Sequence, residues 1–135
     1  MAIQYSFELE YITKEALEHL FLSLEWESGN FPDQLYEAII NSHSVVTAWD
    51  GDQLVGLANA LSDGVMTAYF HYVLTNPVYQ GQGIGKVMME MMLDKYQDYY
   101  TKVLISYPKA IDFYKRLGFE GEDDSLPMYT YTKQV

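Results

Sequence analysis

Three glycines within five residues, followed at once by a lysine, form the part of this sequence best suited to binding chemistry. The stretch, here called the glycine turn, is Gln80-Gly81-Gln82-Gly83-Ile84-Gly85-Lys86. It lies between a predicted strand and a predicted helix, so unpaired backbone N–H groups at the helix N-terminus favour an anion. Because glycines have no side chain to block the main chain, we expect a phosphate or pyrophosphate group there.

Two common nucleotide-binding motifs do not match the glycine turn. A P-loop needs a glycine where Gln80 stands and a hydroxyl residue where Val87 stands. The dinucleotide pattern G-x-G-x-x-G also fails, because its third glycine would fall on Lys86 or Met88. Nucleotide hydrolysis and Rossmann-type dinucleotide binding are therefore disfavoured.

The composition narrows the classes of protein that remain. The 135 residues, 15.6 kDa in mass, predict a single domain over residues 1–135. No cysteine is present, which excludes disulfides, thiolate nucleophiles and cysteine-rich zinc sites. The three histidines show no metal-ligand spacing, so we expect no metal. With no signal-peptide pattern and no apolar run near the roughly 18 residues of a membrane span, we expect a cytoplasmic protein that does not enter a membrane.

The charge is strongly negative and unevenly distributed. The formal net charge is −11, and residues 1–70 hold 11 acidic residues against the single base Lys14. An acidic surface disfavours nucleic acid as a partner. It is consistent either with ordinary solubility or with a cationic substrate drawn to the first half of the chain.

The elements that must position the glycine turn follow from the hydrophobic periodicity. Period-two patterns predict strands, and 3.6-residue patterns predict helices, including one after the glycine turn whose methionines fill the core. The predicted strands cover residues 3–10, 45–49, 54–61, 65–75 and 102–106, one starting at 119, and 128–132; the predicted helices cover 16–24, 33–40, 84–92 and 108–117. The resulting order, β-α-α-β-β-β-α-β-α-β-β, predicts an α/β fold with a mixed sheet.

Two segments together resemble one family. The residues from Gln80 to Gly85 resemble the Q/R-x-x-G-x-G/A signature of the GNAT superfamily of N-acetyltransferases. The stretch from Ala110 to Phe119 resembles the A-x-x-x-Y-x-x-x-G-F segment of the same family. The order of elements also matches, so the resemblance covers nearly the whole chain.

The resemblance implies an enzyme that transfers an acetyl group from acetyl-CoA, its cosubstrate, to a primary amine. Backbone N–H groups of Gln80, Gly81, Gln82, Gly83, Ile84, Gly85 and Lys86 would then hold the pyrophosphate. By the same similarity Val73, Leu74 and Thr75 would pair with the pantetheine, with the Leu74 N–H donating to the thioester carbonyl. Lys109, Lys115 or Arg116 could meet a further phosphate of the coenzyme.

Direct acyl transfer needs no protein nucleophile, but it needs proton transfers. Tyr114 matches the tyrosine that serves as general acid in the family, and a phenol is protonated at pH 7. His71 is the candidate base, since its ordinary pKa suits that role. Strand alternation predicts that His71 shares a face with Tyr69, Val73 and Thr75.

The acceptor pocket is predicted from a short block at the end of the first helix. Glu25 and Glu27 could attract an ammonium group and Trp26 could stack on it. Tyr107 stands where the family often has an asparagine, so it is expected to line the pocket instead. The block from Leu24 to Ser28, followed by the stretch from Leu35 to Ile39, also resembles a bacterial branch related to plant plastid acetyltransferases, which act on arylalkylamines or protein lysines.

Other functions stay open on the sequence alone. One is a non-catalytic acyl-CoA binding or sensor module that keeps the glycine turn without the chemistry. Another is a toxin-type or aminoglycoside-directed transferase, which the acidic first half would permit. The acceptor is expected to be a small cationic amine or a lysine-like group, and a homodimer is compatible with the resemblance.

Overall fold

The computed structural model describes residues 2–132, which hold five strands, four α-helices and three short 3-10 helices. The strands are β1 Gln4–Ser6, β2 Ser44–Asp50, β3 Gln53–Ser62, β4 Thr67–Thr75 and β5 Thr101–Leu104. The α-helices are α1 Lys14–Ser23, α2 Pro32–Ile40, α3 Ile84–Lys95 and α4 Ile111–Arg116. The 3-10 helices are η1 Glu27–Asn30, η2 Pro77–Tyr79 and η3 Pro108–Ala110.

The chain forms two compact units, the first ending at Leu104 and the second beginning at Ile105. The first unit holds the sheet with α1, α2 and α3, and the second holds η3 and α4. A single domain over the whole chain therefore stays a prediction.

The five strands form one mixed sheet in the order β1-β2-β3-β4-β5. The first four strands pair antiparallel, and β4 pairs parallel with β5. Hairpins come first because the Asp50-Gly51 and Asp63-Gly64 turns are short, whereas the parallel pair needs the crossover that α3 provides. The predicted α/β fold with a mixed sheet is confirmed.

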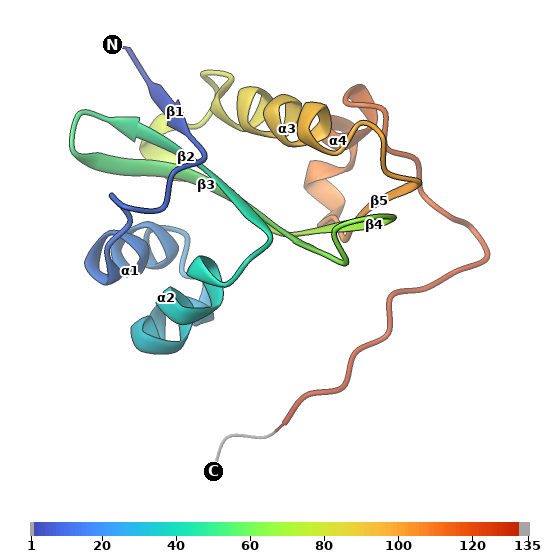
Figure 1. Ribbon diagram of the computed structural model, residues 1–135, viewed down its shortest axis with the longest axis horizontal. Coiled ribbons are helices and arrows are strands. Elements are labelled where there is room, and N and C mark those ends of the chain that lie inside the picture. The colour runs from blue at the N-terminus through green and yellow to red at the C-terminus, as the bar shows by residue number, and fades with distance from the viewer. Residues whose placement is uncertain (1, 133–135) are drawn as a thin grey trace. The chain divides into compact units, whose positions relative to one another are not determined.

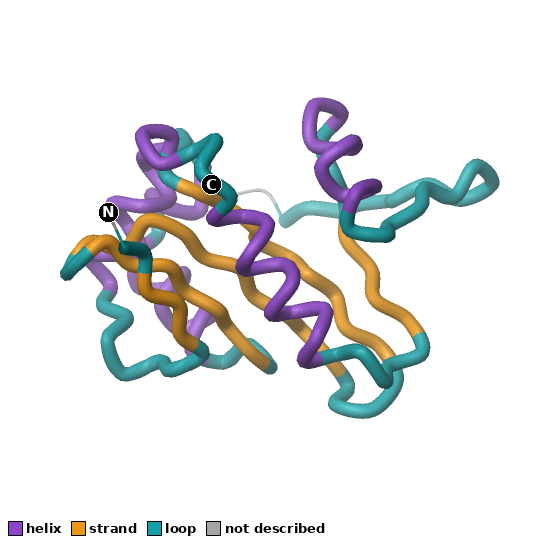
Figure 2. The backbone as a smooth tube through the Cα atoms, turned by 90° about the horizontal axis from the view of Figure 1, so that it is seen from above, coloured by secondary structure: helices purple, strands orange, loops and turns teal. Residues whose placement is uncertain are grey.

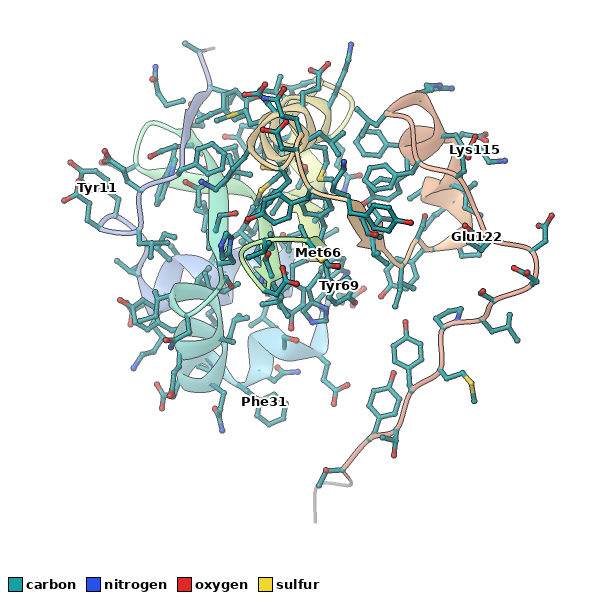
Figure 3. The ribbon with its side chains drawn as sticks, turned by 45° about the vertical axis from the view of Figure 1, so that its right-hand side comes forward. Tyr11, Phe31, Met66, Tyr69, Lys115 and Glu122 are labelled. Carbon is teal, nitrogen blue, oxygen red and sulfur yellow. The ribbon has the colours of Figure 1, made fainter. Side chains whose placement is uncertain are left out.

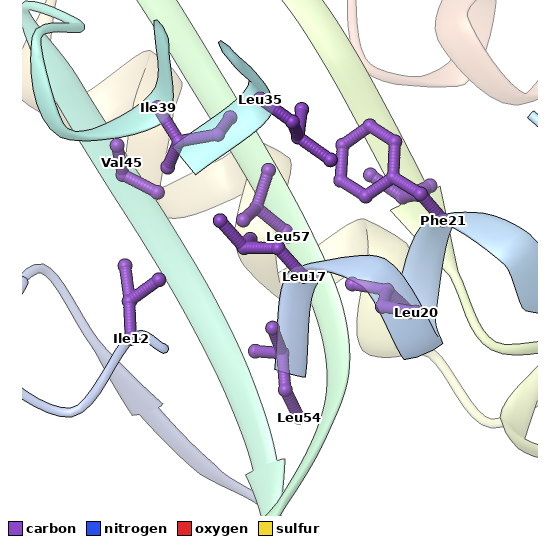
Figure 4. Packing of buried hydrophobic residues seen from close by; sticks show 10 residues of the cluster. Ile12, Leu17, Leu20, Phe21, Leu35, Ile39, Val45, Leu54 and Leu57 are labelled. Atoms are coloured by element: carbon purple, nitrogen blue, oxygen red, sulfur yellow. The ribbon is translucent and has the colours of Figure 1, made fainter. Parts of the chain in front are cut away.

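The sheet is covered on both faces within the first unit (Figure 1). Helices α1 and α2 lie on one face, and α3, the longest helix, lies across the other (Figure 2). A cluster of apolar side chains fills the face toward α1 and α2 (Figure 4), and its buried members are Ile12, Leu17, Leu20, Phe21, Leu35, Ile39, Val45, Leu54, Leu57 and Leu74.

Local sequence explains the two longest helices. The hydroxyl of Thr13 caps α1 by accepting from the Ala16 N–H at 3.0 Å, which satisfies one donor of the first turn. In α3 three of the four methionines predicted as core residues, Met88, Met89 and Met92, are fully buried, whereas Met91 is half-buried.

Three predicted strands differ from the structure. The first is shorter than residues 3–10, because β1 pairs with β2 only opposite Thr47, Ala48 and Trp49. The other two predicted strands, one starting at Phe119 and one over residues 128–132, are wrong. Residues 119–132 contain no strand. A period-two pattern forms a strand only when it pairs with another strand, and residues 119–132 pair with no strand of the described sheet.

Candidate functional site

The loop that leads from the end of β4 into the glycine turn is held by two of its own side chains. Asn76 is buried, and its side-chain oxygen accepts from the Val78 N–H at 3.0 Å. Gln80 closes the loop, because its side-chain amide donates to the carbonyl of Thr75 at 3.1 Å. The turn is therefore held in shape by its own polar side chains before any ligand binds.

Two glycines in this turn adopt backbone angles that other residues rarely take. Gly81 has φ of 81° and Gly83, the residue before α3, has φ of 84°. A Cβ added at either position would meet no described atom within 4 Å, so the space in front of the backbone is open. A ligand can therefore come close to the main chain here.

The start of α3 also lacks the cap that α1 has. No side chain accepts a hydrogen bond at its N-terminus among the described residues, whereas Thr13 caps α1. The first-turn N–H groups have no acceptor within the helix, and the helix dipole adds partial positive charge. Open space, donors without an acceptor in the helix and a positive potential are features that a phosphate group requires, and phosphate binding here stays a prediction.

Tyr79, which was not predicted from the sequence as a site residue, anchors this loop to the β2–β3 hairpin. Tyr79 is only 8% exposed, and its hydroxyl donates to a carboxylate oxygen of Asp50 at 2.5 Å. A second contact joins it to the Gln53 side chain at 3.4 Å. The hydrogen bond to Asp50, together with burial, raises the pKa of Tyr79. Asp50 is the last residue of β2, so the β2–β3 hairpin also holds the loop.

The strand that leads into the turn has one edge without a strand neighbour. Strand β4 is paired with β3 from Ala68 to Thr75, apart from an irregularity after Phe70, but it is paired with β5 only from Thr67 to Phe70. Beyond Phe70, no strand among residues 2–132 lies along that edge. The predicted residues Val73, Leu74 and Thr75 lie in this part of β4, where an extended chain with amide groups could add.

A β-bulge in β4 decides which way His71 points. Ala58 pairs with Val73 and Ala60 with Phe70, so His71 and Tyr72 together oppose the single residue Asn59. The bulge reverses the alternation of faces along the strand.

The faces on the two sides of the bulge show this reversal. Before it, Phe70 packs against Tyr96 near the end of α3, at a ring distance of 5.9 Å. After it, Tyr72 and Leu74 belong to the cluster under α1 and α2. Thr75 pairs with Gly56, whose missing Cβ would touch Ile84 and Met88 of α3. The prediction that His71 shares a face with Val73 and Thr75 is therefore wrong, although its predicted neighbour Tyr69 does contact it.

His71 lies among aromatic residues. Its Nδ1 is 3.1 Å from the hydroxyl of Tyr69, which is labelled in Figure 3, and its ring centroid is 4.3 Å from that of Tyr72. Partial burial of the imidazole lowers the pKa of His71 below its ordinary value. A histidine with a lowered pKa is neutral at pH 7 and can accept a proton.

Tyr72 connects His71 to the predicted acceptor block, and sequence reasoning missed it. Its hydroxyl is hydrogen-bonded to the Ser28 hydroxyl at 2.8 Å, and its ring lies 6.1 Å from that of Trp26. Glu25 and Glu27, on either side of Trp26, are exposed, and Glu25 adopts a left-handed φ of 57°. A prediction of the bulge would have been needed to place Tyr72 on this face.

The second unit carries the remaining predicted residues and is described by itself. The Tyr114 ring lies 5.0 Å from Phe113 and 5.9 Å from Phe119, both edge to face. Burial raises the pKa of Tyr114 to about 12, so its hydroxyl keeps its proton at neutral pH. Tyr107 is 68% exposed. The three basic candidates for a coenzyme phosphate are exposed as well: Lys109, Lys115 and Arg116.

Residues 2–132 contain no group of three or more His, Cys, Asp or Glu side chains placed to hold a metal ion. None of their helices is both long enough and apolar enough to cross a membrane.

Comparison with known proteins gives consistent matches. The sequence model of the acetyltransferase (GNAT) family matches residues 9–119. An uncharacterized N-acetyltransferase, ycf52, of Gracilaria tenuistipitata var. liui is 37% identical over 75 residues, which are 54% of this chain and 41% of that protein. The chloroplastic GCN5-related N-acetyltransferase 2 of Arabidopsis thaliana is 36% identical over 84 residues, 60% of this chain and 33% of that protein. The chain thus spans less than half the length of these relatives.

A solved structure matches along the whole chain. It is a GNAT-family acetyltransferase protein from Streptococcus pneumoniae, with a TM-score of 0.81 and 26% identity. The match covers 98% of each chain.

Proposed function

Because the chain belongs to the acetyltransferase (GNAT) family, we propose that it transfers an acetyl group from acetyl-CoA to a primary amine. The resemblance predicted from the glycine turn and from the segment between Ala110 and Phe119 is confirmed, since the family match includes both. Enzymes of this fold use acetyl-CoA as their cosubstrate.

The observation that carries this proposal is the open, uncapped start of α3. The glycine turn presents backbone N–H groups to open space, with Gly81 and Gly83 in left-handed conformations that keep side chains away. We assign the pyrophosphate of the coenzyme to the residues from Gln80 to Lys86. The exposed Lys109, Lys115 and Arg116 are candidates for a further phosphate.

The edge of β4 without a strand neighbour supports the next assignment. The pantetheine arm carries two amide groups, so it can add to Val73, Leu74 and Thr75 as an extra strand would. The Leu74 N–H is our candidate donor to the thioester carbonyl. Such a donor stabilises the negative charge that develops on that oxygen during attack.

The reaction then needs one proton removed and one supplied. The amine nitrogen forms a bond to the acyl carbon as the carbon–sulfur bond breaks, and the thiolate leaves with the bonding electrons. His71 takes the proton lost by the amine, since its lowered pKa keeps the imidazole neutral at pH 7. Tyr114 gives its proton to the leaving thiolate, because its raised pKa keeps the phenol protonated.

The acceptor is assigned to the side of the sheet where Trp26 and Tyr72 lie. An ammonium group that approaches there meets the exposed carboxylates Glu25 and Glu27 and the ring of Trp26. Tyr107, exposed in the second unit, is proposed as a further lining residue. This chemistry suits a small cationic amine or a lysine-like group.

Two measurements on the same protein test the proposal. Calorimetry measures binding of CoA, and a thiol reagent measures free CoA released from acetyl-CoA in the presence of a panel of amines. We expect binding together with thiol release that depends on at least one amine. Tight binding with no release from any amine would instead favour the acyl-CoA binding module, and no binding would refute the assignment of the glycine turn.

A further inference from the structure

Asn59, in the middle of β3, is a buried polar residue whose side chain makes two hydrogen bonds. It is only 2% exposed. Its side-chain oxygen accepts from the backbone N–H of Tyr72 at 2.7 Å, and its side-chain nitrogen donates to the hydroxyl of Ser42 at 3.0 Å. Burial of a polar side chain is unfavourable unless such bonds replace those to water. Both bonds are therefore needed for an asparagine to occupy this position.

The N–H that Asn59 accepts lies in the β-bulge of β4. The two bulge residues, His71 and Tyr72, oppose Asn59 alone, so the regular ladder between β3 and β4 is interrupted there. The side chain of Asn59 supplies an acceptor at this interruption, in place of a backbone carbonyl. A leucine has a comparable size but no polar atom, so it would leave the N–H of Tyr72 without this acceptor. The amide of Asn59 therefore holds the bulge.

Asn59 is itself held from the end of α2. The hydroxyl of Ser42 donates to the carbonyl of Ala38 at 3.0 Å, which fixes the oxygen that accepts from Asn59. The next residue, His43, donates its backbone N–H to the carbonyl of Ala60 at 2.8 Å, so this turn lies directly beside β3. A chain of hydrogen bonds thus runs from α2 through Asn59 to the bulge in β4.

We propose that Asn59 is a positioning residue for acetyl transfer, because it holds the bulge that sets the directions of His71 and Tyr72. This inference rests on the proposed function, in which His71 takes a proton and Tyr72 lies on the acceptor side. The hydroxyl of Tyr72 is hydrogen-bonded to Ser28 of η1, so its backbone and its side chain are fixed from two different elements. Asn59 acts through the backbone of β4 and not on the acetyl group or the amine.

Asn59→Leu in the full chain tests this role by kinetics and by CoA binding. We expect kcat to fall roughly 10- to 100-fold, because a small misplacement of groups near the reacting atoms is enough for such a loss. The Kd for CoA should stay within about threefold, since Asn76 and Gln80, and not the bulge, hold the loop of the glycine turn. Asn59→Asp keeps an oxygen that can accept from the N–H of Tyr72, so it should restore kcat to within about threefold of the unmodified protein.

Thr47→Val is the matched control for the loss of buried hydrogen bonds. Thr47 is fully buried in β2, and its hydroxyl donates to the carbonyl of Ser6 and accepts from the indole N–H of Trp49. This substitution should lower the Tm as Asn59→Leu does, but it should leave kcat unchanged. Ser42→Ala is a milder second variant that removes only the support of Asn59. It should lower kcat about threefold, and it keeps the test available if Asn59→Leu does not fold.

Hydrogen exchange of the Tyr72 amide, followed by NMR, gives a readout that needs no activity. We expect this exchange to become about tenfold faster in Asn59→Leu, while the amides of α3 change much less. The inference alone would be overturned by a kcat within twofold of the unmodified protein in Asn59→Leu, by an equal loss of kcat in Thr47→Val, or by an unchanged exchange rate at Tyr72. If the unmodified protein releases no CoA with any amine, the proposed function is refuted and this inference with it.

Discussion

Replacement of Gly83 by alanine is the sharpest test of the glycine turn. The new methyl group would meet no described atom within 4 Å, so the only cost to the fold is backbone strain at φ of 84°. A left-handed conformation costs an L-residue about 1–2 kcal/mol, and the lower entropy of the unfolded chain returns about 0.4–1 kcal/mol. We expect a net loss near 1 kcal/mol, which lowers the Tm by roughly 3–5 °C.

Coenzyme binding should fall much more than stability does. The methyl group would occupy the open space in front of the first-turn N–H groups, where the pyrophosphate is proposed to lie. Loss of one hydrogen bond to a charged group costs about 1.5–3 kcal/mol, so the Kd for CoA should rise roughly 10- to 100-fold. Calorimetry measures this Kd, and a thermal unfolding curve measures the stability change.

Gly64 provides a closely matched control for the same strain. Its φ is 83°, and it lies in the β3–β4 turn, at the opposite end of β4 from the glycine turn. A Cβ there would make only an ordinary contact, 3.7 Å from Nε2 of His43. Gly64→Ala should lower the Tm by a similar amount and leave the Kd for CoA unchanged. Equal Kd values for Gly83→Ala and the unmodified protein would refute the reasoning.

Three further substitutions test the chemistry and the loop. Tyr114→Phe should lower kcat at least tenfold and leave the Kd for CoA within twofold, since the hydroxyl is proposed to act only on the leaving thiolate. Burial lowers the pKa of His71, and the base must be unprotonated to act. The value of kcat/KM should therefore rise with pH, with its inflection below about 6.5, the ordinary pKa of histidine. His71→Gln should remove that inflection. Tyr79→Phe loses the hydrogen bond to Asp50 and should raise the KM for acetyl-CoA about three- to tenfold with little change in kcat.

Each of these has an outcome that contradicts it. An unchanged kcat in Tyr114→Phe would remove the general-acid role. The same inflection in His71→Gln would assign the base to another group. For Tyr79→Phe, an equal effect on kcat and on KM would point to a general loss of structure, and Asp50→Asn should keep part of the affinity because an amide oxygen still accepts the hydrogen bond.

The sequence by itself determined the features encoded by near neighbours along the chain. Apolar periodicity predicted which face of each of the first two helices, and of α3, packs against the core. It could do so because a helix brings residues three and four apart together. The spacing of glycines after a strand was enough to predict an anion site, since such a site depends on one turn and one helix start. The expected cytoplasmic location and the absence of nucleic acid as a partner remain predictions from composition.

The tertiary structure alone decided what depends on distant segments. The bulge at His71 and Tyr72 arises from the pairing of β4 with β3, and it moved His71 away from the face of Val73 and Thr75. The hydrogen bond from Tyr79 to Asp50 joins residues 29 positions apart, which no local pattern records. Residues 128–132 have the period-two pattern of a strand but form none. Alternation of side chains shows only that a segment is able to form a strand. Whether the strand forms depends on hydrogen bonds to a neighbouring strand, which the sequence pattern does not specify.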